Sequence, residues 1–382
     1  MNSTNGGLPW SGIIQRVRRV VVKVGTSTLT AGGSRPSEES LWGITRQLTA
    51  AHRAGYDVTL VTSGAIATGA ARLNFPPGPR SIRERQALAA VGQAMLMHEY
   101  ERRFAASGIV VAQMLLTAGD FDQHQAYLNA GNTVEELLRH RVVPIVNEND
   151  TVATEEIRIG DNDTLSARVA ALVNAELLCI LSDVDGLYTA DPHRHPTASR
   201  LDSVERLTEA VEALAKPPRR TALGVGGMIT KLGAARIATA AGTAVAIVHG
   251  GTQDVVLRLL AGEELGTRFL PQPSPLRGRR RWIALRTRTR GRLVIDGGAA
   301  DAIRSRGKSL LPRGVLGVEG RFIAGDVVAI VGPTGGELGR GVVSHGSEDL
   351  ERVKGRASSD VRVILGVKAT EVVHCDNLVI YS

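Results

Sequence analysis

The segment RVVVKVG, residues 19–25, is almost continuously apolar and ends in a glycine turn. Runs rich in Val, Ile and Leu are typical of strands buried on both faces of a parallel sheet. Five further segments have the same character: DVTLVTSG (57–64), GIVVAQML (108–115), VVPIVN (142–147), ELLCILSD (176–183) and AVAIVHG (244–250). We predict that these six segments form strands.

Helical patterns separate the predicted strands, and several begin with a capping residue: Ser37, Ser81, Asn132 or Asp161. The expected helices are 38–54, 81–106, 132–140, 161–174, 203–215, 228–241 and 252–261. This alternation predicts an α/β fold, in which a mostly parallel sheet is sandwiched by helices.

The pattern changes after LPQPSPLRGRR, residues 270–280, which is rich in proline and indicates a stiff linker. Beyond it, RWIAL, GRLVID, DVVAIV and NLVIY are short β-rich runs separated by glycine turns, as in a small antiparallel or mixed β-barrel. We therefore expect four parts: a loose N-terminal extension (1–17), an α/β domain (18–269), a linker (270–279) and a small β-barrel domain (280–382).

Positive charge is concentrated in the C-terminal part of the chain. The formal net charge is +8, and residues 278–382 hold 18 Lys and Arg against 11 Asp and Glu. Ten arginines and two aspartates lie between Arg277 and Arg306. Such a run suits a polyanionic partner such as nucleic acid, and it is equally typical of a solvated surface.

Composition excludes several classes of protein. With Cys179 and Cys375 as the only cysteines, neither a disulfide framework nor a cysteine-based zinc site is expected. The 3% of aromatic residues argue against a surface that stacks single-stranded bases. No apolar run approaches 18 residues, and the first residues lack a signal-peptide pattern. A cytoplasmic protein without a membrane span is expected.

Residues suited to binding or catalysis follow the carboxyl ends of the predicted strands. Ligands bind at these ends in open parallel sheets. Lys23 lies inside an apolar strand, and it either reaches solvent at the strand end or faces phosphate oxygens. Ser63 and Gly64 form a small-residue turn after the second strand. Two polar bursts, residues 147–150 and 160–163, suit a zwitterionic small molecule, with carboxylates for its ammonium and amides for its carboxylate.

Two later segments suit a nucleotide. Ser182 and Asp183 end a strand, although turn chemistry alone accounts for such residues. GVGGMITK, residues 224–231, combines glycines with Lys231 at a helix start, which permits close approach to phosphates. The sequence contains no P-loop motif and no Ser-His or Cys-His nucleophile arrangement. Phosphoryl transfer, which needs positioning and cations, is the reaction these residues suit.

Residues 18–260 closely resemble the glutamate 5-kinases of the amino-acid kinase superfamily. The resemblance is carried, in chain order, by KVGTST (23–28), VTSGAIATGA (61–70), NENDTVA (147–153), GDNDTLSARVA (160–170), LSDVDGLYTADP (181–192) and GVGGMITK (224–231). The last part of the chain resembles the PUA domain, an RNA-binding barrel, in GVEGRFIAGDVVAIV (317–331) and EVVHCDNLVI (371–380). Cys375 stands where an arginine is usual in that tail.

The resemblance implies ATP-dependent phosphorylation of the γ-carboxylate of L-glutamate to L-glutamyl 5-phosphate, the first step of proline synthesis. Its implied catalytic residues are Lys23, Asp163 and Lys231. Glutamate would be held by Ser63, Gly64, Asn147, Asp150 and Asn162. ATP would be held by Lys23, Ser182, Asp183, Val225, Gly226, Gly227, Met228, Ile229, Thr230 and Lys231. Mg²⁺ would bridge ATP oxygens, through protein ligands that the sequence does not identify.

The resemblance also implies a homo-oligomer, inhibition by proline and an RNA partner for the PUA domain. Two other functions stay open at this point. One is an amino-acid kinase with a different acceptor, because the site rather than the fold sets the substrate. The other is an RNA-binding protein whose kinase half serves as a scaffold.

Overall fold

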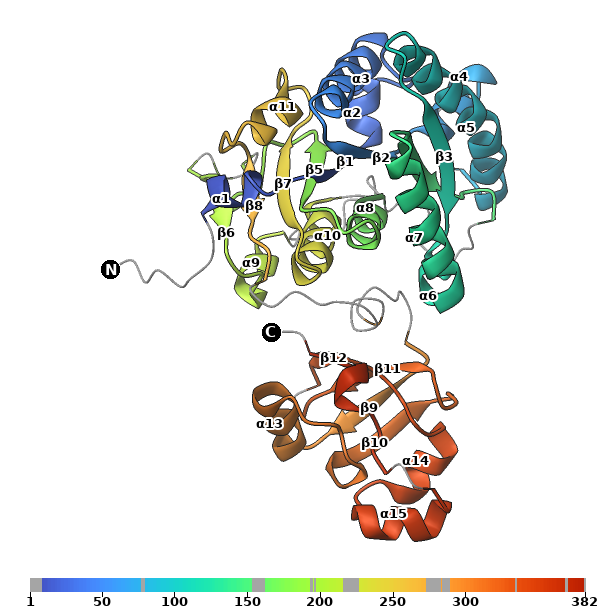
Figure 1. Cartoon of the computed structure of the whole chain (residues 1–382), viewed down its shortest axis with the longest axis vertical. Helices are drawn as coiled ribbons and strands as arrows, with labels where there is room; N and C mark the ends of the chain where they lie inside the picture. The colour runs from blue at the N-terminus through green and yellow to red at the C-terminus, as the bar shows by residue number, and fades with distance from the viewer. Residues whose placement is uncertain are drawn as a thin grey trace. The chain divides into compact units, whose positions relative to one another are not determined.

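The structure is a computed structural model (Figure 1). It describes residues 9–380 apart from 77–79, 153–161, 193, 194, 196, 216–226, 273–282, 284–288, 334, 368 and 369. The chain divides into two compact units: the first is Met1–Asp120 with Gln125–Pro275, and the second is Leu276–Ser382 with Phe121–His124. Most of the predicted linker lies outside the described residues.

An eight-stranded sheet forms the centre of the first unit, in the order β3-β4-β2-β1-β5-β7-β8-β6. Its strands are β1 (Arg19–Val24), β2 (Asp57–Thr62), β3 (Val111–Leu116), β4 (Val143–Glu148), β5 (Leu177–Ser182), β6 (Ser203–Val204), β7 (Ala244–His249) and β8 (Thr267–Phe269). The pairs from β3 to β7 are all parallel, whereas β8 runs antiparallel to β7. The six predicted strands and the mostly parallel sheet are thus confirmed.

Helices cover both faces of this sheet, with α2, α3 and α11 on one side and α8 and α10 on the other (Figure 1). The helices of the unit are α1 (Trp10–Ile14), α2 (Thr26–Thr30), α3 (Glu38–Arg53), α4 (Ala65–Arg72), α5 (Ile82–Ala105), α6 (Ala118–Asp122), α7 (His124–Arg139), α8 (Asn162–Leu172), α9 (Glu209–Ala213), α10 (Met228–Ala240) and α11 (Val255–Leu260). Ser37 caps α3, and Ser81 forms a capping box with Glu84 at α5.

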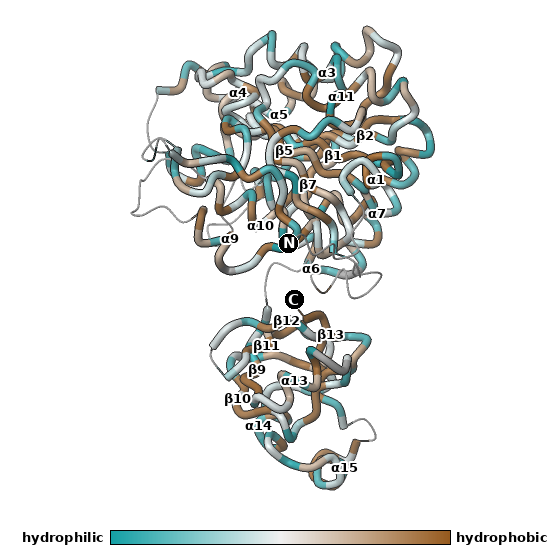
Figure 2. The backbone as a smooth tube through the Cα atoms, turned by 90° about the vertical axis from the view of Figure 1, so that its left-hand side faces the viewer, coloured by the Kyte–Doolittle hydropathy of each residue, from teal (hydrophilic) through white to brown (hydrophobic). Residues whose placement is uncertain are grey.

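The central strands are the most hydrophobic part of the unit (Figure 2). Alternate residues of each strand point to opposite faces, so Val20, Val22 and Val24 of β1 pack into the core beneath α3, α5 and α11. Lys23 has the other parity and therefore faces the side of the sheet that α8 covers. The alternation of side chains along β1, together with the contact between α8 and β1, thus places the side chain of Lys23 beneath α8.

The helix predictions fail at two places. Helix α7 begins at His124, eight residues before the predicted cap Asn132. Gly131 lies inside α7, where a Cβ atom would stand 3.2 Å from Leu172 of α8. The predicted helix 203–215 is instead the short strand β6 followed by α9, because the side chain of Thr208 caps the helix there.

The described part of the N-terminal segment is not the loose extension expected from its composition. Residues 10–14 form α1, and Trp10 is only 3% exposed. Trp10, Ile13, Ile14 and Val17 belong to the same core cluster as β1. The free energy gained by burying these apolar side chains exceeds the preference of the neighbouring residues for turns.

Helices α4 and α5 touch through glycine. A Cβ atom at Gly69 would overlap the carbonyl of Leu88, and one at Gly92 would overlap the carbonyl of Ala65. The two backbones are therefore in direct contact. This packing matters for the site, because α4 follows the turn at Gly64 and α5 carries residues that reach the same region.

The second unit contains a five-stranded mixed sheet in the order β10-β9-β11-β12-β13. Its strands are β9 (Gly291–Ile295), β10 (Val315–Gly320), β11 (Val327–Val331), β12 (Glu337–Val342) and β13 (Leu378–Ile380), and its helices are α13 (Gly297–Arg306), α14 (Ser347–Val353) and α15 (Ser358–Leu365). Among the described strands of this sheet, only β9 and β11 pair in parallel. A small mixed β domain is confirmed; the predicted RWIAL strand lies, except for Ile283, outside the described residues.

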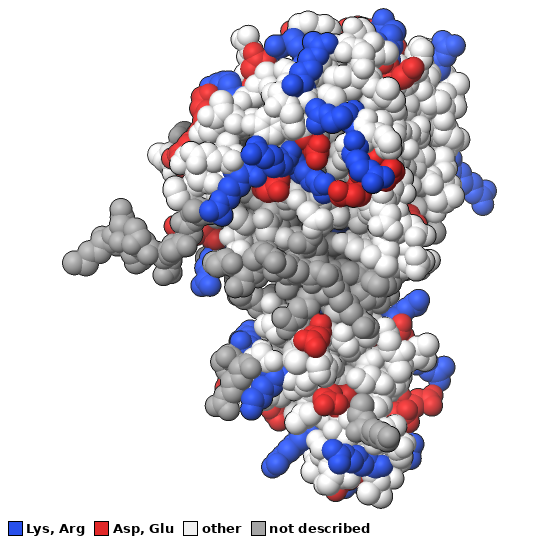
Figure 3. Space-filling view, in the orientation of Figure 1, with Lys and Arg blue, Asp and Glu red and all other residues white. Residues whose placement is uncertain are grey.

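Charge on the described surface is mixed. Lys and Arg lie among Asp and Glu on both units in the view of Figure 3. Residues 277–282 and 284–288, which include much of the arginine-rich run, lie outside the described residues. Across the described chain, every helix is too short or too polar to cross a membrane.

The glycine contact between α4 and α5 yields a test with a matched control. Gly92→Ala should lower the free energy of unfolding by about 1–3 kcal/mol, because the new methyl group forces the two backbones apart. Gly233→Ala, in the interior of α10, has open space around its Cβ position. It should raise that free energy by about 0.4–1 kcal/mol, since alanine restricts the unfolded chain.

Urea denaturation of the full chain measures both changes. If Gly92→Ala and Gly233→Ala shift the midpoint in the same direction, the close approach of α4 and α5 is wrong.

Candidate functional site

Four parallel strands bring the predicted site residues to one edge of the first sheet. Lys23 and Gly25 end β1, Ser63 and Gly64 follow β2, Asn147 lies at the end of β4, and Ser182 ends β5. Because β4, β2, β1 and β5 are adjacent and parallel, their carboxyl ends meet. The edge is therefore a place where side chains from distant parts of the sequence can act on one ligand.

Three buried charges form the centre of this edge. Lys23 Nζ lies 2.6 Å from Asp163 Oδ1, and Lys231 Nζ lies 3.4 Å from Asp163 Oδ2. The two lysines are each 6% exposed and Asp163 is 2% exposed. Lys23 is thus not a strand-end lysine that reaches solvent. The structure brings together β1, the start of α8 and the start of α10 through a single carboxylate.

The ionisation of Asp163 follows from its neighbours. Burial by itself raises the pKa of this carboxyl group, but the ammonium groups of Lys23 and Lys231 and the hydroxyl of Thr230 hold the pKa below its ordinary value. Asp163 is therefore a carboxylate at neutral pH, and two ammonium groups around one carboxylate leave the cluster with a net positive charge.

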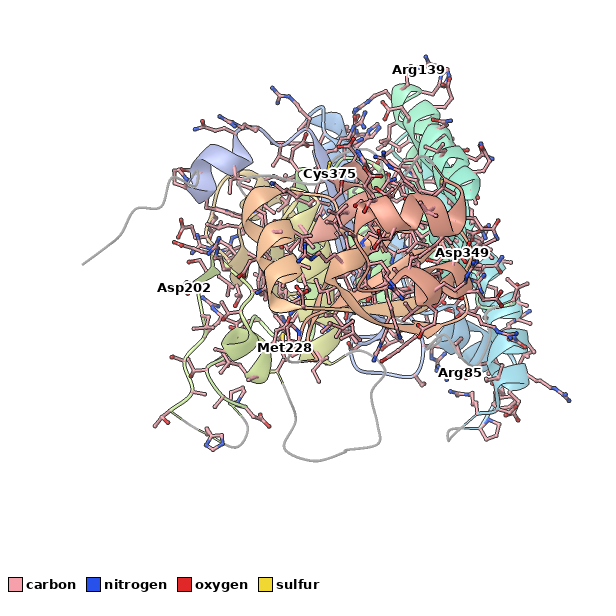
Figure 4. All side chains as sticks on the ribbon, turned by 90° about the horizontal axis from the view of Figure 1, so that it is seen from below. Arg85, Arg139, Asp202, Met228, Asp349 and Cys375 are labelled. Carbon is pink, nitrogen blue, oxygen red and sulfur yellow. The ribbon has the colours of Figure 1, made fainter. Side chains whose placement is uncertain are left out.

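The first turn of α10 orients this cluster and offers backbone donors. Thr230 Oγ1 donates to Asp163 Oδ2 at 2.6 Å. Gly227, the N-cap residue, supplies no capping side chain, and Met228 begins the helix (Figure 4). Uncapped N–H groups at a helix start attract anions. Val225 and Gly226, predicted to bind ATP, lie outside the described residues.

A cavity of about 350 Å³ adjoins the cluster through α8, because Asn162 lines the cavity and its chain neighbour is Asp163. All five residues predicted to hold glutamate line this cavity: Ser63, Gly64, Asn147, Asp150 and Asn162. Nine other lining residues were not among the predicted site residues, and Thr26, Arg80 and Glu148 are three of them. The turn at Gly64 needs glycine, since its φ is +104°.

A buried hydrogen-bond network fixes the amide side chains of the cavity. Asn162 Nδ2 lies 2.7 Å from the carbonyl oxygen of Thr62, 2.8 Å from Ser63 Oγ and 2.9 Å from Asn147 Oδ1. Asn147 Nδ2 donates to Gln93 Oε1 at 2.8 Å. Helix α5 thereby holds the amide of β4, and Gln93 is a positioning residue that no sequence motif identified.

The same helix supports the network from behind. Tyr100 lies fully buried on α5, with its hydroxyl 2.8 Å from Thr62 Oγ1. Burial raises the pKa of Tyr100 to about 12, so the hydroxyl stays neutral. The tyrosine therefore anchors the end of β2, just before Ser63, without adding charge near the cavity.

Three polar atoms of the cavity residues lack a hydrogen-bond partner within the described part of the chain: the acceptors Asn162 Oδ1 and Asp150 Oδ1, and the donor Arg80 Nε. Burial, together with the nearby charge of Glu148, raises the pKa of Asp150 to about 7, although Arg85 opposes this shift. Buried polar groups are normally paired. Unpartnered acceptors on a cavity wall therefore indicate a ligand that carries hydrogen-bond donors and positive charge.

Ser182 and Asp183 are held by their own turn at the end of β5. Ser182 Oγ donates to Asp183 Oδ1 at 3.1 Å and accepts from the backbone N–H of Val184 at 3.4 Å. Ser182 is buried, whereas Asp183 is exposed. Neither residue lines the cavity of Asp150, so they lie on a separate part of the edge, beside β1.

The carboxylate at the centre of the cluster already has cationic partners. Both oxygens of Asp163 face ammonium groups. Within the described residues, the one cluster of three metal-ligating groups is His374, Cys375 and Asp376 in the second unit. The residues at the edge are therefore compatible with a Mg²⁺ ion that arrives bound to the phosphate oxygens of a nucleotide, because Mg²⁺ commonly binds such oxygens.

The chain matches known proteins over most of its length. A profile of the amino acid kinase family matches residues 18–270, and the PUA domain profile matches residues 291–365. The glutamate 5-kinase of Deinococcus radiodurans is 49% identical over 363 residues, which cover 95% of this chain and 99% of that protein.

The glutamate 5-kinases of Caldanaerobacter subterraneus subsp. tengcongensis and Moorella thermoacetica are 45% and 46% identical. These matches cover 95% and 96% of this chain, and 97% of each relative. The resemblance seen in the sequence motifs is confirmed. The chain therefore belongs to the amino acid kinase family, within it to the glutamate 5-kinases, and it carries a PUA domain after its kinase domain.

Proposed function

We propose that this protein transfers the γ-phosphoryl group of ATP to the side-chain carboxylate of L-glutamate, which gives L-glutamyl 5-phosphate and commits glutamate to proline synthesis. The observation that carries the proposal is the adjacency of Asn162 and Asp163. Through these two residues, a polar cavity sized for a small amino acid adjoins a buried pair of ammonium groups.

The chemistry needs no general base. A glutamate side chain has an ordinary pKa of about 4.3, so its carboxylate is already a nucleophile at neutral pH. One oxygen of that carboxylate forms a bond to the γ-phosphorus as the bond to the ADP oxygen breaks. The difficulty is the repulsion between two anions, which Lys23 and Lys231 reduce from positions fixed by Asp163.

ATP is proposed to lie across the ends of β1 and β5, with its phosphates toward the uncapped start of α10. Lys23, Ser182, Asp183 and residues 225–231 are its proposed contacts, as the family resemblance implies. Mg²⁺, bound to the phosphate oxygens, supplies charge neutralisation. Asp163 keeps the lysines in place for this purpose and is not a metal ligand in the proposal.

Glutamate is proposed to occupy the cavity with its γ-carboxylate toward Asn162. Asp150, whose Oδ1 has no partner, would bind the α-ammonium group. Burial and the charge of Glu148 raise the pKa of Asp150, and a positively charged ligand would stabilise its carboxylate form. Ser63, Gly64, Asn147 and Asn162 would supply the remaining polar contacts. The product is an acyl phosphate, which water hydrolyses readily, so a cavity that excludes water protects it.

Four further properties are proposals. A cytoplasmic location rests on composition, RNA binding through the PUA domain rests on the family and on the arginine-rich run, and a homo-oligomer and inhibition by proline rest on the family alone. Salt dependence separates RNA binding from catalysis, because binding to phosphates weakens steeply as salt rises.

A trapping assay tests the activity directly. Purified protein with Mg²⁺, ATP and hydroxylamine should convert L-glutamate to a hydroxamate, because hydroxylamine captures acyl phosphates. Aspartate, acetylglutamate and a reaction without acceptor serve as controls. Equal signal with another acceptor would overturn the assignment of glutamate. No signal from a folded sample that binds ATP would favour the RNA-binding function.

The two lysines should be needed for turnover. Lys23→Ala and Lys231→Ala should each lower kcat at least ~100-fold, the scale of one lost transition-state donor. Lys354→Ala removes the same side chain from the second unit, where Lys354 pairs with Glu351 on the surface, and should leave kcat unchanged. Initial rates at saturating substrate, with a melting curve for each variant, provide the measurement. Near-normal turnover in a folded Lys23→Ala or Lys231→Ala would refute their role.

Asp150 should give the reaction a pH dependence. Its pKa of about 7 means that the carboxylate form, which binds an ammonium group, is lost as pH falls below 7. We expect kcat/KM for glutamate to fall about tenfold per pH unit below that value. Asp150→Asn should raise KM, change kcat little and remove this acidic limb. Asp202→Asn, an exposed carboxylate far along the sequence, is the control. An acidic limb that survives in Asp150→Asn would assign it to another group.

A further inference from the structure

Arg80 is a charged residue of the acceptor cavity that the proposed phosphoryl transfer does not use. It lines the cavity together with Glu148 and Asp150. Among the described lining residues, it carries the only positive charge. The inference below rests on the proposed function, because it concerns how the same cavity selects its acceptor.

The surroundings of Arg80 hold its guanidinium group but, among the described residues, give its Nε no hydrogen-bond acceptor; the charge of Arg80 also lowers the pKa of Glu84, after the two hydrogen bonds that Glu84 makes with Ser81. The group lies 5.7 Å from the centre of the Phe75 ring, a stacking contact that limits its motion. Ser81 and Glu84 form the capping box directly after it, with hydrogen bonds of 2.7 and 3.3 Å that fix the backbone.

The ligand that would complete this site is a carboxylate. A guanidinium group presents a planar fork of N–H donors that matches the two oxygens of a carboxylate. When the γ-carboxylate of glutamate lies toward Asn162, its α-carboxylate and α-ammonium groups still need partners. Asp150 offers an unpartnered acceptor for the ammonium, and Arg80 offers a donor fork for the carboxylate.

We propose that Arg80 binds the α-carboxylate of the amino-acid acceptor and makes the cavity selective for acceptors in which that carboxylate is free. In the proposed function, the γ-carboxylate of the acceptor and the phosphoryl group already have Lys23 and Lys231 as cations. Both lysines pair with Asp163 at the start of α8. Arg80 belongs to a different segment, between α4 and α5. It therefore recognises the part of the substrate that does not react.

The test compares two acceptors that differ only at the α-carboxylate. L-Isoglutamine keeps the γ-carboxylate and the ammonium group of L-glutamate but has a neutral amide at the α position. Arg80→Gln should lower kcat/KM for L-glutamate by about 10- to 100-fold, the scale of a charge-assisted hydrogen-bond pair. For isoglutamine the change should stay within about threefold, since the lost charge has no partner there. The preference of the wild type for glutamate then largely disappears.

Two further variants separate recognition from structure. Arg83→Gln removes an exposed arginine from the first turn of α5, the helix that follows Arg80, and should change neither acceptor's kcat/KM. Arg80→Lys keeps the charge without the fork and should recover part of the preference for glutamate. An equal loss for both acceptors in Arg80→Gln would show a structural role. No loss for either acceptor would show that Arg80 does not contact the substrate. Each of these results overturns the inference.

Calorimetric binding of the same two compounds, without ATP, keeps this inference distinct from the proposed reaction. If the wild type forms no hydroxamate yet binds glutamate more tightly than isoglutamine, and Arg80→Gln removes that difference, the inference stands and the proposed reaction fails. If hydroxamate forms and the ratio between the acceptors is unchanged in Arg80→Gln, the reaction stands and the inference fails.

Discussion

The carboxylate of Asp163, held between two buried ammonium groups, is the constraint on which the rest of the site depends. A buried charge without its partner costs about 3–5 kcal/mol, so β1, α8 and α10 must meet at this point for the first unit to be stable. One carboxylate does not neutralise two lysines. The cluster therefore keeps its attraction for phosphate while it remains stable enough to be buried.

The start of α8 links this cluster to the acceptor cavity, since Asn162 and Asp163 are consecutive residues. Asn162 is fixed by Thr62, Ser63 and Asn147, so the position of the cluster and the shape of the cavity are set together. The cavity also contains polar atoms without partners, which cost free energy when the site is empty. A zwitterionic ligand removes that cost on binding, and the same atoms that reduce stability thus provide affinity.

Much of this arrangement could be predicted from sequence because it follows local rules. The buried strands show as apolar runs, and Lys23 and the 147–163 cluster stand out as polar residues at strand ends. Gln93 and Tyr100 could not be predicted, because their partners, Asn147 and Thr62, are 54 and 38 residues away. The close packing at Gly131 and Gly92 could not be predicted either, since a glycine that permits close helix packing looks in the sequence the same as one that breaks a helix.

In the proposed function, the two kinds of cation at the site correspond to two kinds of anion. A lysine ammonium is a compact charge with rotating donors, which suits a phosphoryl group whose oxygens shift during transfer. An arginine fork is rigid and planar, which suits a carboxylate that stays in place. In the proposed function, Lys23 and Lys231, both paired with Asp163, meet the reacting end, and Arg80, which stacks on Phe75, meets the α-carboxylate. Under that proposal, the type of cation at each place follows from whether the group it meets changes shape during the reaction.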